Sequence, residues 1–167
     1  MNGAHFHLAF NHLPIIFPIV GLIVLAGGYI FKSEVIKRVA FFIFIFGALF
    51  TIPAFGSGEG AEEVIENLPG IDKKFILAHE EKAELFAILS YLLGAFSLFA
   101  LWANWKKKAF SNIIAIVLFV FAIVSIYFAK VTGTTGGEIR HTEIRSDFSK
   151  VNSSEAGQIK NLEGEDD

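Results

Sequence analysis

Four runs of apolar residues dominate the sequence, at residues 13–31, 39–55, 83–103 and 109–129. None of them contains Lys, Arg or Asp, and their one acidic residue is Glu84, at the start of the third run. A helix needs about 20 apolar residues to cross a bilayer, within a range of about 17–25. A stretch such as AFFIFIFGALF also lacks the polar stripe that a helix of a soluble bundle presents to water. The runs therefore predict an all-α, four-span transmembrane helix bundle with up-down-up-down topology.

The rest of the chain divides into a membrane domain and a tail. Three histidines and no basic residue precede the first run, so we expect a retained span and not a cleaved signal peptide. We assign residues 1–145 to the four-helix domain with its histidines. Residues 146–167 are polar and rich in Ser, Asn, Glu and Asp, and we expect this segment to stay disordered.

Charge in the connecting segments predicts the orientation. The two short loops at 32–38 and 106–108 hold six of the fourteen basic residues. The longer middle loop, 56–82, has seven acidic residues against three lysines. Short basic loops stay in the cytoplasm, so we predict a multi-pass protein of the bacterial inner (cytoplasmic) membrane with both termini outside. Membrane lipid is then a partner, and nucleic acid is not expected to be one.

All five histidines fall on the predicted outer side. If the segment before the first span is helical, His5 and His12 share a face, and if it is extended, His5 and His7 do. His79 lies just before the third span and His141 just after the fourth. Two or more imidazoles are therefore expected to converge at this end of the bundle.

Local signals around the outer loops refine this expectation. Asp72, after a Pro-Gly turn, is the predicted N-cap of a helix that continues into the third span and directs His79 onto an apolar stripe. Residues 62–66 are expected to form a short surface helix. The glycines of TGTTGG, at 132–137, predict a flexible exit from the fourth span that folds Arg140 and His141 back over the bundle end.

The absence of cysteine limits the chemistry. Disulfides, Cys-ligated iron–sulfur clusters, covalent c-type haem and Cys-based zinc sites are excluded, and the one methionine is Met1. Any metal must therefore be held by His, Asp or Glu. A conventional hydrolase is not expected, because the sequence has neither a nucleophile elbow nor an HExxH motif.

Four motifs, HFHLAFNHLPI, GSGEGAEEVIENLPG, AHEEKAE and GGEIRHTEIR, resemble in order those of an uncharacterised family of small bacterial four-helix membrane proteins. The resemblance covers residues 5–145. Within Gly58-Glu59-Gly60-Ala61-Glu62 the chain has a glycine where the family pattern has proline, and Thr142 also replaces a proline. The family is distantly similar to a domain-of-unknown-function class whose members are sometimes fused to cytochrome c or Rieske domains, which implies membrane electron transfer by analogy. The resemblance singles out these positions: His5, His7, His12, Glu59, Glu62, His79, Glu80, Arg140, His141 and Glu143.

Three functions remain open from the sequence. The first is a b-type haem protein that transfers electrons at the outer face, because a helix bundle commonly holds cofactors and haem iron takes axial histidines. The expected electron carriers are quinone and a periplasmic cytochrome or respiratory complex. Its cofactor-binding candidates are His5, His7, His12, His79, His141 and Arg140, with the arginine available for a propionate.

The second is a non-haem Fe, Zn or Cu site, because a mixed imidazole and carboxylate set suits such metals. Its candidate ligands are His5, His7, His12, His79, His141, Glu59, Glu62, Glu80 and Glu143. The third is a cofactor-free accessory subunit of a respiratory complex, whose acidic middle loop would dock a basic partner. The sequence leaves open whether the protein is an enzyme.

Overall fold

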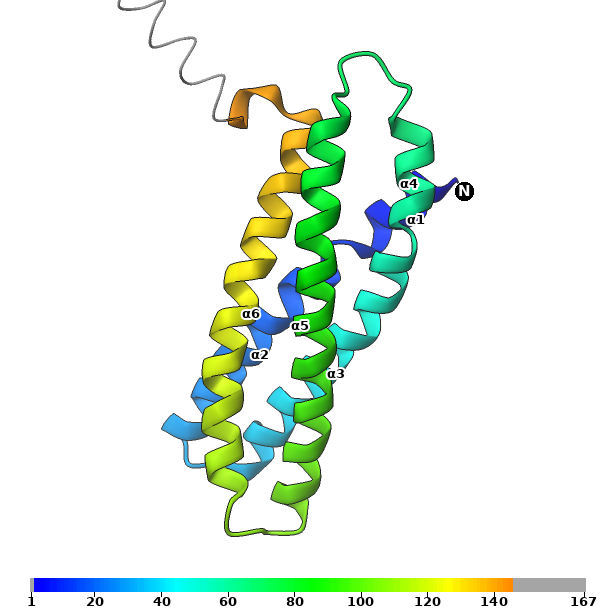
Figure 1. Cartoon of the computed structure of the whole chain (residues 1–167). Coiled ribbons are helices and arrows are strands. Elements are labelled where there is room, and N and C mark those ends of the chain that lie inside the picture. Colours follow the sequence, from blue (N-terminus) through cyan, green and yellow to red (C-terminus); the bar gives the residue numbers. More distant parts are fainter. Residues whose placement is uncertain (1, 146–167) are drawn as a thin grey trace, which may run out of the picture.

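The computed structural model describes residues 2–145, so the predicted disorder of 146–167 falls outside the described residues. The chain is all-α, and four long helices form a bundle, with two short helices at one end (Figure 1). The elements are α1 (Gly3–Phe10), α2 (Leu13–Ile30), α3 (Glu34–Gly56), α4 (Gly58–Ile65), α5 (Lys73–Trp105), α6 (Ser111–Arg140) and the 3₁₀ turn η1 (Thr142–Ile144).

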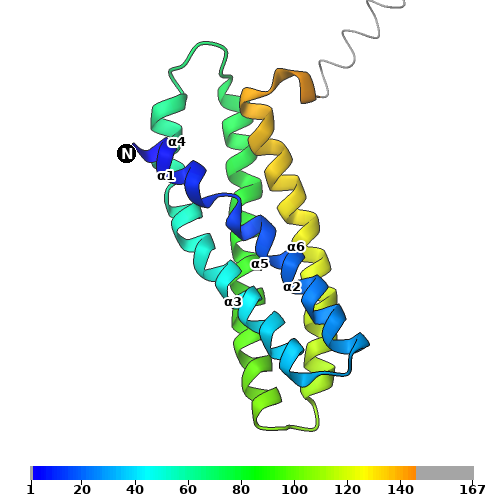
Figure 2. The same cartoon turned by 180° about the vertical axis from the view of Figure 1, so that it is seen from behind.

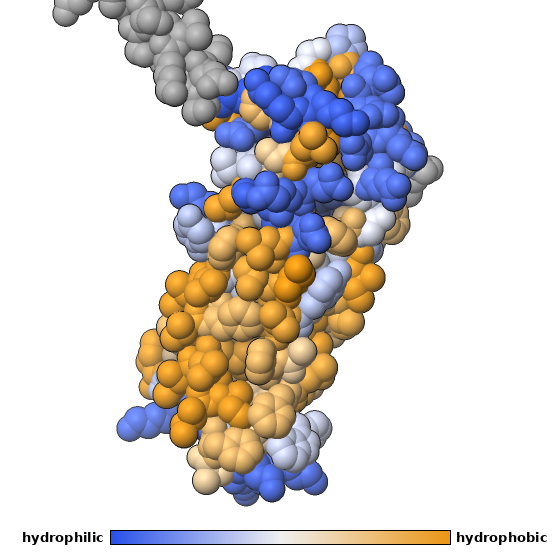
Figure 3. All heavy atoms as spheres, viewed as in Figure 1, coloured by the Kyte–Doolittle hydropathy of each residue, from blue (hydrophilic) through white to orange (hydrophobic). Residues whose placement is uncertain are grey.

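The predicted four-helix bundle is confirmed. Each of four segments is long and apolar enough to cross a membrane: Gly3–Ile30, Glu34–Ile65, Lys73–Trp105 and Ser111–Arg140. Large apolar side chains remain exposed along all four, as a lipid-facing surface requires. Figure 3 shows this surface as a continuous apolar band between two polar ends. The chain is therefore a multi-pass membrane protein by the length and composition of its helices.

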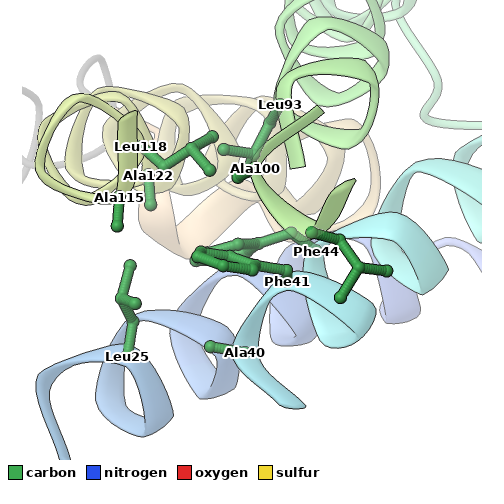
Figure 4. Packing of buried hydrophobic residues seen from close by; sticks show 10 residues of the cluster. Leu25, Ala40, Phe41, Phe44, Leu93, Ala100, Ala115, Leu118 and Ala122 are labelled. Carbon is green, nitrogen blue, oxygen red and sulfur yellow. The ribbon is translucent and has the colours of Figure 1, made fainter. Parts of the chain in front are cut away.

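The helices pack in sequence order around a narrow core. α2 lies against α3, α3 against α5, α5 against α6, and α6 closes the ring against α2 (Figures 1 and 2). Phe41 and Phe44 of α3 point into the centre of the bundle, where Leu25, Leu93 and Leu118 of the other helices meet them (Figure 4). Small residues of α5 and α6 let the backbones approach each other there.

One interhelical hydrogen bond crosses the apolar core. The hydroxyls of Thr51 on α3 and Ser90 on α5 lie 2.7 Å apart, and both side chains are buried. Thr51 also donates to the carbonyl of Gly47 in its own helix. With no water in the bilayer core, such paired hydroxyls avoid the cost of an unsatisfied polar group.

One end of the bundle, which we call the basic end, is closed by a polar network that joins the helices. Lys37 of α3 is only 4% exposed, and its Nζ donates to Glu34 Oε1 at 2.8 Å and to Asn112 Oδ1 of α6 at 2.9 Å. Glu34 also accepts from Asn104 of α5, which in turn accepts from Arg38 at 2.6 Å. Sequence reasoning treated these charges only as signs of orientation, because it could not show which helix ends meet.

At the opposite end, one sequence expectation is wrong. Residues 132–137 do not form a flexible exit, because α6 continues as a helix through Arg140. Threonine hydroxyls stabilise this stretch: Thr134 donates to the carbonyl of Lys130, and Thr132 donates to the carbonyl of Lys82 on α5, both at 3.0 Å. The chain turns only after His141, and Arg145 then caps the helix by donating to the carbonyls of Glu138 and Ile139.

Candidate functional site

The end opposite the basic end carries all five histidines, and we call it the histidine end. His7 lies on α1, a short helix that Asn2 caps by accepting from the backbone N–H of His5 at 3.0 Å. The helix places His7 against the end of α3. There, His7 Nδ1 lies 3.0 Å from the carbonyl oxygen of Ala54 and 3.2 Å from Ser57 Oγ. Ser57 itself donates to the same Ala54 carbonyl at 3.0 Å.

His79 makes the same arrangement on the other helix pair. Its helix, α5, begins after Asp72, whose side chain accepts from the backbone N–H of Lys74 as the sequence predicted. His79 Nδ1 lies 3.1 Å from the carbonyl oxygen of Thr132 on α6 and 3.2 Å from Thr135 Oγ1. Thr135 donates to the Thr132 carbonyl at 3.0 Å, as Ser57 does to Ala54.

These contacts fix the orientation of both imidazoles. A carbonyl oxygen only accepts hydrogen bonds, so Nδ1 of His7 and of His79 must carry the hydrogen. In the neutral ring Nε2 then holds a lone pair that can bind a metal or accept a proton. Metal-binding histidines commonly donate their other ring N–H to a carbonyl in this way. The two side chains are half-buried.

Close backbone approaches hold the two imidazoles in place. A Cβ at Gly136 of α6 would lie 3.0 Å from Cε1 and 3.2 Å from Nδ1 of His79, so the ring packs directly on the helix backbone. On the other side, Gly3 of α1 packs against the backbone of Gly60 on α4, and a Cβ at Gly3 would clash with the Gly60 carbonyl. Glycine is thus needed at Gly3 for the contact of α1 with α4, and glycine at Gly136 lets the His79 ring pack on α6 without a shift.

The other three histidines are exposed and arranged differently. His5 and His12 do not share one helix face, because α1 ends at Phe10 and His12 stands at the start of α2. His141 Nδ1 pairs with Glu143 Oε1 at 2.9 Å, and both side chains are more than half exposed.

Arg140 and the glutamates do not join the two anchored imidazoles in a ligand cluster. Arg140 is exposed at the end of α6, and Glu59 and Glu80 are exposed on α4 and α5. Glu62 lies 3.9 Å from Lys73 Nζ. Among the described residues, no three His, Asp or Glu side chains are grouped so that they could hold a metal ion, so the predicted nine-residue metal set is not assembled there.

A pocket adjoins Ser57, which contacts His7, and three aromatic rings stack between α1, α2 and α3. Ser57 lines a surface pocket of about 480 Å³ together with Phe6 of α1 and Pro53 of α3. Ring centroids of Phe10 and Phe50 are 6.3 Å apart and those of Phe17 and Phe50 are 5.5 Å apart, in both cases with the rings stacked. The polar anchor of His7 therefore adjoins a pocket, and a stacked aromatic cluster joins the same three helices.

Sequence reasoning found both anchored histidines but not the residues that anchor them. Ser57, Thr132 and Thr135 looked like parts of glycine-rich loops, whereas they belong to or flank the ends of long helices. The sequence signal for these anchors was a hydroxyl residue three positions after the residue whose carbonyl it binds, as in Ser57 after Ala54 and Thr135 after Thr132. A comparison of the chain with protein-family models, curated proteins and solved structures gives no match.

Proposed function

We propose that the chain is a membrane protein that holds a b-type haem between His7 and His79 and transfers electrons at the histidine end. The observation that carries the proposal is the matched anchoring of the two rings. Each imidazole is held by Nδ1 at 3.0–3.1 Å from a helix carbonyl, which leaves Nε2 as the coordinating atom. Haem iron takes one or two axial histidines and needs no cysteine.

The donor set favours haem over the non-haem alternatives. Two half-buried imidazoles from different helix pairs match a cofactor that receives a ligand on each face. Three or more protein ligands would be expected for a structural or catalytic zinc site. The stacked rings of Phe10, Phe17 and Phe50 offer an apolar surface for a flat macrocycle. A bound haem would supply one-electron transfer, and the residues of this chain would set its position and exclude water.

The proposal includes an orientation and a partner. The segments at the basic end are short and rich in lysine, which favours the cytoplasmic side for that end and the outer face of the bacterial inner membrane for the histidines. Quinone in the bilayer and a periplasmic cytochrome or respiratory complex are the electron carriers that such a position would serve. The glutamates of α4 would suit a basic partner.

The test compares single histidine variants of the full chain. We expect His7→Ala and His79→Ala each to lose the visible absorption of the cofactor, while circular dichroism shows the helices intact. His5→Ala and His141→Ala are the matched controls, because these side chains are exposed, and they should keep wild-type absorption.

A second measurement separates ligation from folding. Added imidazole should restore the spectrum of His79→Ala by binding in the vacated space, and it should not change the controls. Full cofactor content in both His7→Ala and His79→Ala would overturn the proposal. Cofactor loss in the controls as well would show that the site is elsewhere at this end.

A further inference from the structure

The two turns at the basic end share an unusual feature. Among residues 2–145, the non-glycine residues with positive φ are Lys32 and Lys107, at 48° and 49°. Left-handed backbone is costly for a residue with a Cβ atom and is the usual place of glycine. Two separate turns thus adopt a backbone conformation that costs free energy, and in each turn the residue in that conformation is a lysine.

Both turns have the same hydrogen-bond pattern, a Schellman motif that ends the preceding helix. After α2, Lys32 N–H donates to the Tyr29 carbonyl and Ser33 N–H to the Gly28 carbonyl, at 3.1 and 2.9 Å. After α5, Lys107 and Lys108 repeat this pattern with carbonyls three and five residues earlier, at 3.0 and 2.9 Å. In such a motif the left-handed residue is usually glycine. The helix dipole favours a cation here, but Lys106, one residue earlier, already provides one after α5.

The lysines of these turns have no carboxylate partner within the described chain. Lys32, Lys106, Lys107 and Lys108 are all exposed, and none forms an ion pair with a carboxylate of the described chain. Glu34, the acidic residue next to the first turn, accepts hydrogen bonds from Lys37 and Asn104 instead. Four cations therefore stand at one end of the bundle without internal counter-charges.

Large apolar side chains border these cations. Phe31, Trp102 and Trp105 are 73%, 47% and 67% exposed, and Lys108 Nζ lies 5.6 Å from the centre of the Trp102 ring. Exposed tryptophans of this kind sit at the level of lipid headgroups. A ligand that fits this surface has negative charge next to long apolar chains, which is the chemistry of an anionic phospholipid and not of a soluble anion.

We propose that the basic end, through Lys32, Lys106, Lys107 and Lys108, is a binding surface for anionic phospholipid headgroups. The two left-handed lysines extend charge from both turns toward the same leaflet. Juxtamembrane lysines each contribute a favourable interaction with anionic lipid. The proposal does not depend on the cofactor at the histidine end.

The test titrates the detergent-purified full chain with phosphatidylglycerol and with phosphatidylcholine, and follows bound lipid by native mass spectrometry. We expect preferential phosphatidylglycerol binding by the wild type. The double variant K32G/K107G should bind it more weakly, by about fivefold for each lysine removed. Because glycine relieves the left-handed strain, the thermal stability of K32G/K107G should equal or exceed that of the wild type. A loss of lipid binding by this variant would therefore not be caused by unfolding.

K73Q/K130Q is the matched control, since it removes two exposed lysines elsewhere and should bind lipid as the wild type does. K32N/K107N, in which asparagine tolerates the left-handed backbone, repeats the charge removal if the glycine variant does not fold. Equal phosphatidylglycerol binding by the wild type and by these turn variants would overturn the proposal. Inorganic phosphate should not displace the lipid, and full displacement by phosphate would show a free-phosphate site instead.

Discussion

At the basic end, Lys37 donates to Glu34 and to Asn112, and the network continues through Asn104 to Arg38. At the histidine end, His7 and His79 each use one ring nitrogen for a helix carbonyl, and the other nitrogen makes no hydrogen bond within the described chain. At the basic end, the polar groups bind one another and join the helices. The histidine end holds two polar groups rigidly while leaving each with a lone pair, as a site for an external ligand requires.

Removal of Lys37 should give the largest effect on stability. Its side chain is 6% exposed and that of Glu34 is 48% exposed. Lys37→Ala leaves the Glu34 carboxylate with Asn104 as its one remaining partner in the network, and it removes the donor to Asn112. We expect a loss of about 2–3 kcal/mol of unfolding free energy, less than for a fully buried pair because Glu34 is half exposed. Reversible unfolding in detergent measures it.

Lys106→Ala is the control at the same end, because Lys106 is exposed, and it should change stability by less than about 0.5 kcal/mol. The cofactor content of Lys37→Ala should match the wild type. A stability loss no larger than that of Lys106→Ala would show that the network does not hold the basic end together.

A matched pair of glycine substitutions tests the packing of His79. A Cβ at Gly136 would lie 3.0 Å from the His79 ring, whereas one at Gly133 would lie an ordinary 3.5 Å from Ile15 Cδ1. Alanine favours the helix at both positions by about 0.5–1 kcal/mol. We therefore expect Gly133→Ala to retain its cofactor and Gly136→Ala to lose cofactor affinity by about tenfold, for a ring displacement that costs about 1.4 kcal/mol in binding. Equal cofactor affinity of both variants would contradict the account of how His79 is held.

Removal of the anchoring hydroxyls should produce two equal and modest effects. Ser57→Ala and Thr135→Ala each delete one acceptor of Nδ1 and leave the carbonyl in place. We expect each to cost about 0.6 kcal/mol of stability, the average for an interhelical side-chain hydrogen bond in a membrane protein. Thermal unfolding beside Thr134→Ala, whose hydroxyl bonds only within α6, checks this. Clearly unequal effects would indicate that the two anchors are not equivalent.

The smallest effect is expected at the N-cap of α5. The hydrogen bond from Lys74 N–H lowers the pKa of Asp72 from its ordinary value of 3.8. The stabilisation by this carboxylate is therefore fully present above pH 3.8 and is lost as the pH falls through the lowered pKa. The difference in thermal unfolding midpoint between the wild type and Asp72→Ala, measured from above pH 3.8 downward, should shrink as the pH falls. A difference that is independent of pH would mean that the cap does not act through its charge.

The apolar runs were sufficient to predict the helices because lipid exposure requires long uniform stretches. The start of α5 directly after Asp72 could also be predicted, because the N-cap signal lies within three residues of the helix start. The continuation of α6 through TGTTGG could not, because glycine lowers helix propensity and the compensating contact of Gly136 with His79 joins residues far apart in sequence.

The same limit applies to the candidate site. Histidine spacing along the chain favoured a shared face for His5 and His12 in a helical segment, or for His5 and His7 in an extended one. The segment is helical but ends at Phe10, which separates His5 from His12, and α1 places His7 against the end of α3. The anchors Ala54 and Thr132 act through backbone carbonyls, which leave no signature in the sequence. Which of the five histidines are anchored therefore depends on helix packing.

The most direct test of the central claim is a reduced-minus-oxidised visible spectrum of the purified protein, with metal analysis of the same sample. The proposal predicts the sharp α band of a b-type haem and iron in proportion to protein. A flat spectrum with stoichiometric non-haem metal would contradict haem binding and favour a His-based metal site. A flat spectrum without metal, from a preparation supplied with haem, would contradict a cofactor role for His7 and His79.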